Sequence, residues 1–210
     1  MSNAAVIANL KAQLGEFRAP EKRRIAGIEF RKAEVTVMRS HATLSSWLIA
    51  QALAEKRTVA LIGWSELCLI DATRTRHSID QLICLPEGGL DAAAIAAEGF
   101  DLVIVRTGEN LSRGTYHRFQ SKIRGTNAVC ILVHDTATGC YPLYEPRTLE
   151  ISAGRRIRGL RIAIDMQHRG GGRREEVIAT IGHISEPQDH KPQGNNPHQS
   201  PLHIVTDHAS

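Results

Sequence analysis

The sequence predicts an α/β domain of three layers, in which helices cover both faces of a mostly parallel sheet. Between residues 34 and 133, five short apolar runs alternate with four helical segments, a pattern typical of strand–helix–strand crossovers. Runs such as Thr58–Ile62 and Ala128–Val133 are apolar on both faces, as strands buried between two helical layers are. The 210 residues, 42% of them hydrophobic, are enough to form one sizeable core.

The predicted strands are β-rich runs, each of which ends where turn residues or a helix begin. They are Glu34–Met38, Thr58–Ile62, Gln81–Leu85, Asp101–Val105 and Ala128–Val133. The predicted helices carry apolar residues three and four positions apart, which places these residues on one helical face. They are Thr43–Lys56, Glu66–Thr75, an alanine-rich stretch over residues 88–97, and Ser112–Arg124.

Residues 1–27 precede this alternating pattern and predict a helix followed by a linker. The helix covers Ser2–Leu14, because its apolar residues Val6, Ile7, Leu10 and Leu14 fall on one face. Residues 18–27 are rich in bases and are interpreted as a basic linker to the main domain.

After residue 141, polar and apolar residues alternate, which predicts half-exposed antiparallel strands. They are Arg147–Ala153, Leu160–Gln167 and Glu176–Ile181, and with them the core domain spans residues 28–182. From residue 183 to residue 210 the chain is dominated by Pro, Gln, Asn and His, a composition that predicts a disordered polar tail.

Positive charge is concentrated in the late strands. The formal net charge of the chain is +4, whereas Arg147 to Arg174 contains eight bases and two acids, 8 − 2 = +6. Such a field attracts polyanions or an acidic protein surface, and the third interpretation is a solvated face without a partner. The candidate contact residues are Arg155, Arg156, Arg158, Arg161, Arg173 and Arg174. No aromatic residue follows Arg147, so a stacking platform for single-stranded nucleic acid is not expected.

Four cysteines are widely spaced along the chain and predict reduced, buried thiols in a cytoplasmic protein: Cys68, Cys84, Cys130 and Cys140. No apolar run is long enough to cross a membrane, and no secretory signal is expected. The ten histidines are scattered along the chain, so neither a metal site nor a cofactor is predicted.

The loop after the first predicted strand is where a parallel α/β nucleotide-binding domain holds phosphate, with glycines for close backbone approach and a lysine for charge. Here the segment Arg39–Ser45 contains neither residue type. A plain helix N-terminus capped by Ser40 or Thr43 explains it. The alternative is a degenerate phosphate loop that uses Ser40, Thr43 and Ser45.

The strand Asp101–Val105 is where an ATPase ends in a carboxylate that holds Mg²⁺, but Arg106 and Thr107 follow here. We expect Asp101 to lie at the opposite edge of the sheet. A second pattern, Gly63-Trp64-Ser65, has the strand–Gly-x-Ser context of a hydrolase nucleophile elbow, but Leu67 stands where a small residue is required. Ser65 is therefore interpreted as the cap of the next helix, and no catalytic residue is assigned.

The segments VALIGW, DQLICLP, FDLVIVR and AVCILV, in this order after an N-terminal helix and a first strand without a phosphate loop, resemble the actinobacterial ImuA-prime proteins. These are RecA-like accessory factors of damage-induced (SOS) mutagenic DNA synthesis. The resemblance covers roughly residues 1–182. Ser65 departs from it, because the family often has proline there, and residues 108–110 match its loop weakly.

The resemblance implies a RecA-like core that has lost nucleotide hydrolysis and acts as an adaptor in translesion DNA repair synthesis. The implied partners are a Y-family-polymerase-like protein of the ImuB type and, through it, an error-prone replicative-type polymerase. The face with Val6, Ile7, Leu10 and Leu14 then becomes a candidate for self-association or RecA contact, against packing on its own domain. Three alternatives stay open: a degenerate ATPase, a RecA-like cell-division inhibitor and a direct DNA-binding protein.

Overall fold

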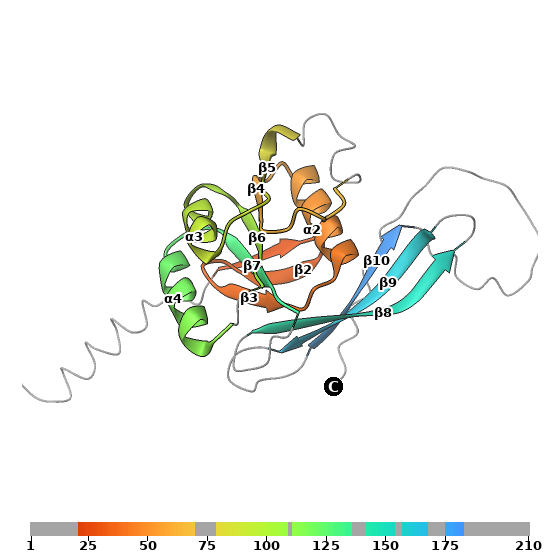
Figure 1. Ribbon diagram of the computed structural model, residues 1–210. Helices are drawn as coiled ribbons and strands as arrows, with labels where there is room; N and C mark the ends of the chain where they lie inside the picture. Colours follow the sequence, from red (N-terminus) through yellow and green to blue (C-terminus); the bar gives the residue numbers. More distant parts are fainter. Residues whose placement is uncertain are drawn as a thin grey trace, which may run out of the picture.

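Eight strands form one mixed sheet in the order β10-β9-β8-β3-β7-β6-β4-β5 (Figure 1). The computed structural model describes residues 21–69, 79–108, 111–135, 142–153, 157–167 and 175–182. The parallel strands are β3 (Val35–Met38), β4 (Val59–Ile62), β5 (Leu82–Leu85), β6 (Leu102–Arg106) and β7 (Val129–Val133). These five strands confirm the predicted ones to within a residue at each end.

Helices cover both faces of the sheet, as predicted. Helix α2 (Ala42–Ala54) packs on one face, and α3 (Leu90–Gly99) and α4 (Arg113–Ile123) pack on the other (Figure 1). Because successive strand residues point to opposite faces, each buried strand contributes to two apolar clusters. In β6, for example, Ile104 packs in the cluster with α2, and Val103 packs in the cluster with α3 and α4.

The predicted helix Glu66–Thr75 is wrong in its described part, because residues 66–69 are not helical. Trp64 and Leu67 are nonetheless buried, at 5% and 6% exposed. An irregular chain satisfies that burial by folding over α2, where the Ser46 hydroxyl donates a hydrogen bond of 2.6 Å to the Cys68 carbonyl. Ser65 therefore caps no helix there. A short 3₁₀ turn (Ile79–Gln81) precedes β5.

The predicted basic linker is also corrected, because its second half begins a β-hairpin. Strands β1 (Lys22–Ile25) and β2 (Ile28–Arg31) pair antiparallel around Ala26 and Gly27, whose φ angles of 54° and 78° suit a tight hairpin turn. Ile25, Ile28 and Phe30 are buried. The hairpin docks through Phe30, whose ring stacks on that of Tyr144 at 5.5 Å between centroids.

Three long strands extend the parallel sheet: β8 (Leu143–Ala153), β9 (Ile157–Gln167) and β10 (Glu175–Gly182). The first residues of β8 pair in parallel with β3, and the strand then continues past β3 and pairs antiparallel with β9. We call β8, β9 and β10 the arm; it projects from the domain in Figure 1. It confirms the predicted antiparallel strands, which begin earlier than the sequence indicated.

The predicted N-terminal helix, with Val6, Ile7, Leu10 and Leu14, lies outside the described residues, and so does the predicted tail from residue 183 onward. Across the described ranges, no helix is both long and apolar enough to cross a membrane.

Candidate functional site at the carboxyl edge of the parallel strands

The carboxyl ends of β3, β4, β6 and β7 meet at one edge of the sheet, which is where open α/β sheets bind ligands. Asp101 immediately precedes β6 and therefore lies at the opposite, amino edge, as expected. There its carboxylate accepts hydrogen bonds from Arg23 and from the backbone amide of Thr58. Burial raises the pKa of Asp101, but these hydrogen bonds outweigh it and lower the pKa overall.

Only three residues, 39–41, separate the end of β3 from the start of α2. The helix cap is His41 and not Ser40 or Thr43 as predicted: its Nδ1 accepts a hydrogen bond of 3.2 Å from the Leu44 amide. Its Nε2 lies 3.2 Å from the Thr148 hydroxyl on the arm. The Leu44 amide therefore already donates its hydrogen bond to the imidazole. A phosphate bound at this helix N-terminus would need that amide.

The three residues of the degenerate phosphate loop are not brought together by the structure. Ser40 and Thr43 are exposed, whereas Ser45 is fully buried and its hydroxyl has no hydrogen-bond partner among the described residues. Arg39, at the start of the loop, forms an ion pair of 2.7 Å with Glu145 of β8. The loop between β3 and α2 therefore contacts the arm through this ion pair.

Arg106 stands at the end of β6, where a nucleotide hydrolase would present a carboxylate to Mg²⁺. Its guanidinium lies 3.0 Å from the Glu66 carboxylate, 3.5 Å from that of Asp135, and 5.1 Å from the centre of the Trp64 ring. A backbone hydrogen bond, assisted by Ser65 and Arg106, lowers the pKa of Glu66. Arg106 thus joins the loops that follow three strands.

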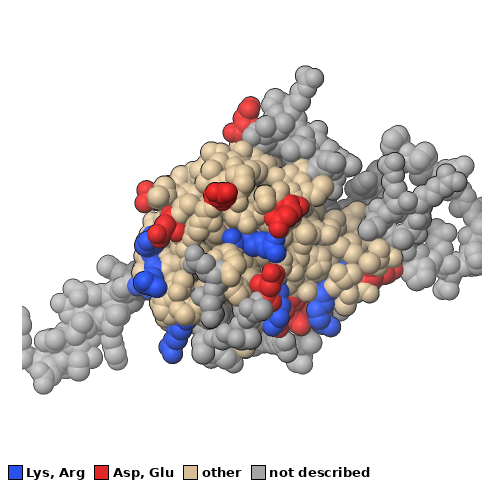
Figure 2. Space-filling view, viewed as in Figure 1, with Lys and Arg blue, Asp and Glu red and all other residues tan. Residues whose placement is uncertain are grey.

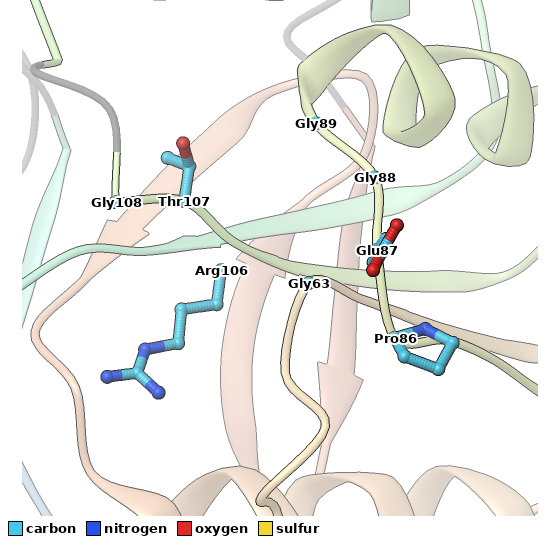
Figure 3. A pocket seen from close by; sticks show the side chains of 8 residues that line it. All are labelled: Gly63, Pro86, Glu87, Gly88, Gly89, Arg106, Thr107 and Gly108. Atoms are coloured by element: carbon cyan, nitrogen blue, oxygen red, sulfur yellow. The ribbon is translucent and has the colours of Figure 1, made fainter.

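An open hollow of about 520 Å³ lies between the ends of β4, β5 and β6. It is lined by Gly63, Pro86, Glu87, Gly88, Gly89, Arg106, Thr107 and Gly108. Figure 3 shows that the Arg106 side chain extends away from Gly88 and Gly89, so the guanidinium does not face the start of α3. Backbone glycines supply much of the wall, and a nucleophile paired with a base is not among the lining residues.

Neither the nucleophile elbow nor a metal site is assembled in the described part of the chain. Ser65 contacts the carboxylate of Glu66 at 3.3 Å and is not followed by a helix. Within those residues, no three His, Cys, Asp or Glu side chains lie close enough to hold a metal ion. The prediction of buried thiols holds for Cys130, whose pKa burial raises to about 12, but is wrong for the exposed Cys68 and Cys84. Cys140 lies outside the described residues.

Residues 24–138 match the family described as the MT3502 N-terminal domain. The match covers more than half of the chain, and it runs from β1 through β7. The chain belongs to this family. Among curated proteins, none matches the chain. The MT3502 N-terminal domain therefore contains the carboxyl edge with His41, Arg106 and the hollow, and the arm follows it.

The arm, which lies after the MT3502 N-terminal domain, carries the predicted basic surface. Of the six candidates, only the side chain of Arg161 is described, and it lies 3.4 Å from the Glu150 carboxylate. Arg147 similarly lies 3.4 Å from Asp165 and 3.5 Å from Glu176. Arg155, Arg156, Arg173 and Arg174 and the side chain of Arg158 lie outside the description.

The predicted charge excess of the arm shrinks when its neighbouring acids are counted. Residues 145–176 contain eight bases and five acids, 8 − 5 = +3, because Glu145, Glu175 and Glu176 flank the stretch first considered. Figure 2 shows acidic and basic atoms side by side over β8. The described side chains of the arm therefore form a surface of mixed charge.

The cap of the MT3502 N-terminal domain's helix α2 predicts a pH dependence of stability. Burial lowers the pKa of His41, and the cap requires the neutral ring. The unfolded chain, with a histidine pKa of about 6.5, therefore binds this proton first, and the stability due to the cap falls as the pH drops below that value. The variant His41→Asn keeps a cap that does not titrate.

Urea unfolding at pH 7.5 and at pH 5.5 tests this expectation. The free energy of unfolding is expected to fall by up to about 1 kcal/mol more in the wild type than in His41→Asn, the size of a cap. Equal losses in the two proteins would show that His41 does not carry this dependence.

Proposed function

We propose that this protein is a non-catalytic, RecA-like adaptor in damage-induced translesion DNA synthesis. It binds a Y-family-polymerase-like protein and, through it, an error-prone replicative-type polymerase. The proposal combines the resemblance of the strand–helix segments to ImuA-prime proteins with the geometry of the carboxyl edge. Its action is scaffolding: surfaces hold partner proteins together, and no bond is made or broken.

The observation that carries the proposal is the occupied N-terminus of α2. A phosphate loop needs free backbone amides at this helix start, a glycine-rich approach and a lysine. Here the His41 ring accepts the hydrogen bond of the Leu44 amide, and the connection to β3 is only three residues long. The geometry supports an adaptor because the loop between β3 and α2, which would bind a triphosphate in a nucleotide hydrolase, contacts the arm instead.

Arg106 supports the same proposal independently. Its positive charge stands where Mg²⁺ would be held, and two carboxylates already neutralise it at 3.0 and 3.5 Å. Those carboxylates are exposed, at 67% and 61%, so the contacts add little stability each. Their effect is to fix the loops after β4, β6 and β7 into one surface.

The strand order also supports a core other than the common dinucleotide-binding ones. Numbered along the chain from β3, the parallel strands and β8 lie in the order 3-2-4-5-1-6. The Rossmann order is 3-2-1-4-5-6 and the flavodoxin-like order is 2-1-3-4-5. In this protein the first strand lies between the fifth and the sixth. The Rossmann and flavodoxin-like folds bind their ligands in a crevice beside the first strand, and this strand order does not reproduce that crevice.

Two measurements on the full chain test the proposal. A fluorescent ATP analogue with Mg²⁺ is expected to show no saturable binding, whereas co-expression with a Y-family-polymerase-like protein is expected to give a complex that survives gel filtration. The triple change Arg155→Glu, Arg156→Glu and Arg158→Glu is expected to weaken that complex at least tenfold without changing the melting temperature. Exposed Arg24→Glu, on β1, is the control.

Saturable ATP binding that is lost in Ser40→Ala/Thr43→Ala would favour the degenerate ATPase and sink the adaptor proposal. Recovery of a tubulin-like division protein in place of the polymerase homologue would favour the cell-division inhibitor. A complex that forms equally well with the triple variant would keep the adaptor but assign its contact surface elsewhere.

A further inference from the structure

Helix α4 carries positive charge on one side, separate from that of the arginine-rich arm. Residues 110–134 contain four bases and no acid, 4 − 0 = +4, which equals the formal net charge of the whole chain. The bases are Arg113, Arg118, Lys122 and Arg124. The arm also holds four bases without an acid between Glu150 and Asp165, but of these only Arg161 has a described side chain, and it lies 3.4 Å from Glu150.

The fold places these bases on the outer side of the domain. Tyr116, Phe119 and Ile123 point inward and pack in the cluster that α4 shares with β3, β6 and β7. The bases occupy exposed positions on the remaining face, from the first turn of the helix to its C-cap. Figure 2 shows basic atoms gathered along the edge of the molecule where α4 lies in Figure 1.

Acidic side chains near this face neutralise it only in part. Lys122 forms an ion pair of 2.6 Å with Asp91 of α3, and the two side chains are 52% and 87% exposed. A pair this exposed is weak and is screened by salt, so a phosphate group can replace the carboxylate. Glu98 on α3 is the other exposed acid of the neighbouring helix.

The chemistry of the face fits a phosphate backbone better than a protein surface. None of the exposed large apolar residues of the described chain lies on α4, and its aromatic residues are buried. The centres of protein interfaces are depleted in charged residues, whereas nucleic-acid interfaces are polar and strongly positive. Arg113 and Arg124 are eleven residues apart, or about 16 Å along a helix, a length of duplex axis over which DNA carries about nine phosphate charges.

We propose that the outer face of α4 is a sequence-independent contact for the phosphate backbone of DNA. Tyr116 and Phe119 are buried, and the half-exposed ring of His117 contacts Tyr116 and Arg113, so we expect the contact to depend on charge and not on sequence. The proposal does not depend on the adaptor function, because it uses only the charge and exposure of α4. In the full chain, this contact would hold the protein on DNA while other surfaces bind proteins.

The test is fluorescence anisotropy with labelled DNA of about 20 base pairs, at salt concentrations from about 50 to 200 mM. The full chain is expected to bind it weakly, with a dissociation constant of about 10⁻⁴ to 10⁻⁶ M. The α4 variant Arg113→Gln, Arg118→Gln and Lys122→Gln is expected to bind at least tenfold more weakly. It is also expected to reduce the slope of log affinity against log salt by about 2 to 3.

The matched control changes three bases of the β1–β2 hairpin, the exposed Lys22→Gln and Arg24→Gln and the half-exposed Arg31→Gln. It alters the net charge equally, so a loss of affinity below threefold is expected. Glutamine is chosen because it is a good helix former, and unchanged circular dichroism and melting temperature verify the fold. If the α4 triple variant is unstable, the single variant Arg118→Gln, which removes no ion pair, replaces it in the binding measurement.

Equal weakening by the two triple variants would overturn the proposal, because general charge attraction would then explain the binding. Absence of DNA binding by the wild type at about 50 mM salt would overturn it as well. If polyglutamate competes as effectively as DNA, the face binds an acidic protein and the proposal fails. None of these outcomes bears on whether a polymerase homologue is bound.

Discussion

Replacing Gly63 by alanine is expected to lower the free energy of unfolding by about 4 kcal/mol or more, which is exceptional for one methyl group. Gly63 has a φ angle of +70°, which costs an alanine about 1 to 2 kcal/mol. A Cβ atom there would also lie less than 3.0 Å from the Arg106 carbonyl oxygen and 3.2 Å from that of Gly88. Arg106 cannot retreat easily, because its strand is hydrogen-bonded on both sides.

Two other glycines separate the two causes of this loss. Gly125 has a φ angle of +99° but nothing within 4 Å of an added Cβ, so Gly125→Ala measures backbone strain alone. Gly89 has open space and an extended φ, but it is the N-cap of α3, where alanine is poorer than glycine, so Gly89→Ala is expected to cost up to about 1 kcal/mol. Urea unfolding of the three variants provides the measurement. Gly63→Ala must lose clearly more than Gly125→Ala, and equal losses would contradict the close packing of the strand ends.

The parallel core could be predicted because its strands are buried on both faces. A run such as Val129–Val133, fully apolar, has no helical or half-exposed alternative of the same length. The hairpin β1–β2 was not predicted, because its signal in the sequence is weaker. The hairpin β1–β2 has only four residues per strand, and its bases Lys22 and Arg24 alternate with inward residues, which resembles a charged linker.

The site was harder to predict than the fold, because it depends on contacts between distant segments. The missing glycines and lysine of Arg39–Ser45 could be seen in the sequence. That His41 caps α2 and reaches Thr148, 107 positions away, could not. The ion pairs of the arm could not be predicted for a similar reason, since Arg147 lies 3.5 Å from Glu176 on another strand.

Helix α4 illustrates how a polar residue can be required by strand geometry. The amide of Val35 and the amide of Val37 face the same side of β3, where Val37 pairs with the Pro142 carbonyl at 2.9 Å. Strand β8 begins only at Leu143, so Val35 has no strand partner there. Gln120 replaces it: its side-chain oxygen accepts from the Val35 amide at 2.7 Å, and its nitrogen donates to the Ala33 carbonyl at 2.8 Å.

The change Gln120→Met is therefore expected to lower the free energy of unfolding by about 2 to 4 kcal/mol, because two backbone groups lose their partners in a buried place. Methionine has a similar length, so lost packing contributes little. Tyr116→Phe removes one hydrogen bond, to the Val35 carbonyl at 3.0 Å, and is expected to cost about 1 kcal/mol.

Hydrogen exchange locates the effect within β3. In Gln120→Met the Val35 amide is expected to exchange at least tenfold faster, relative to the Val37 amide of the same protein, than in the wild type. The Val37 amide serves as an internal reference because its partner, the Pro142 carbonyl, is untouched by the change. If both amides accelerate equally, the variant only destabilises the whole domain, and Gln120 does not stand in for the missing strand.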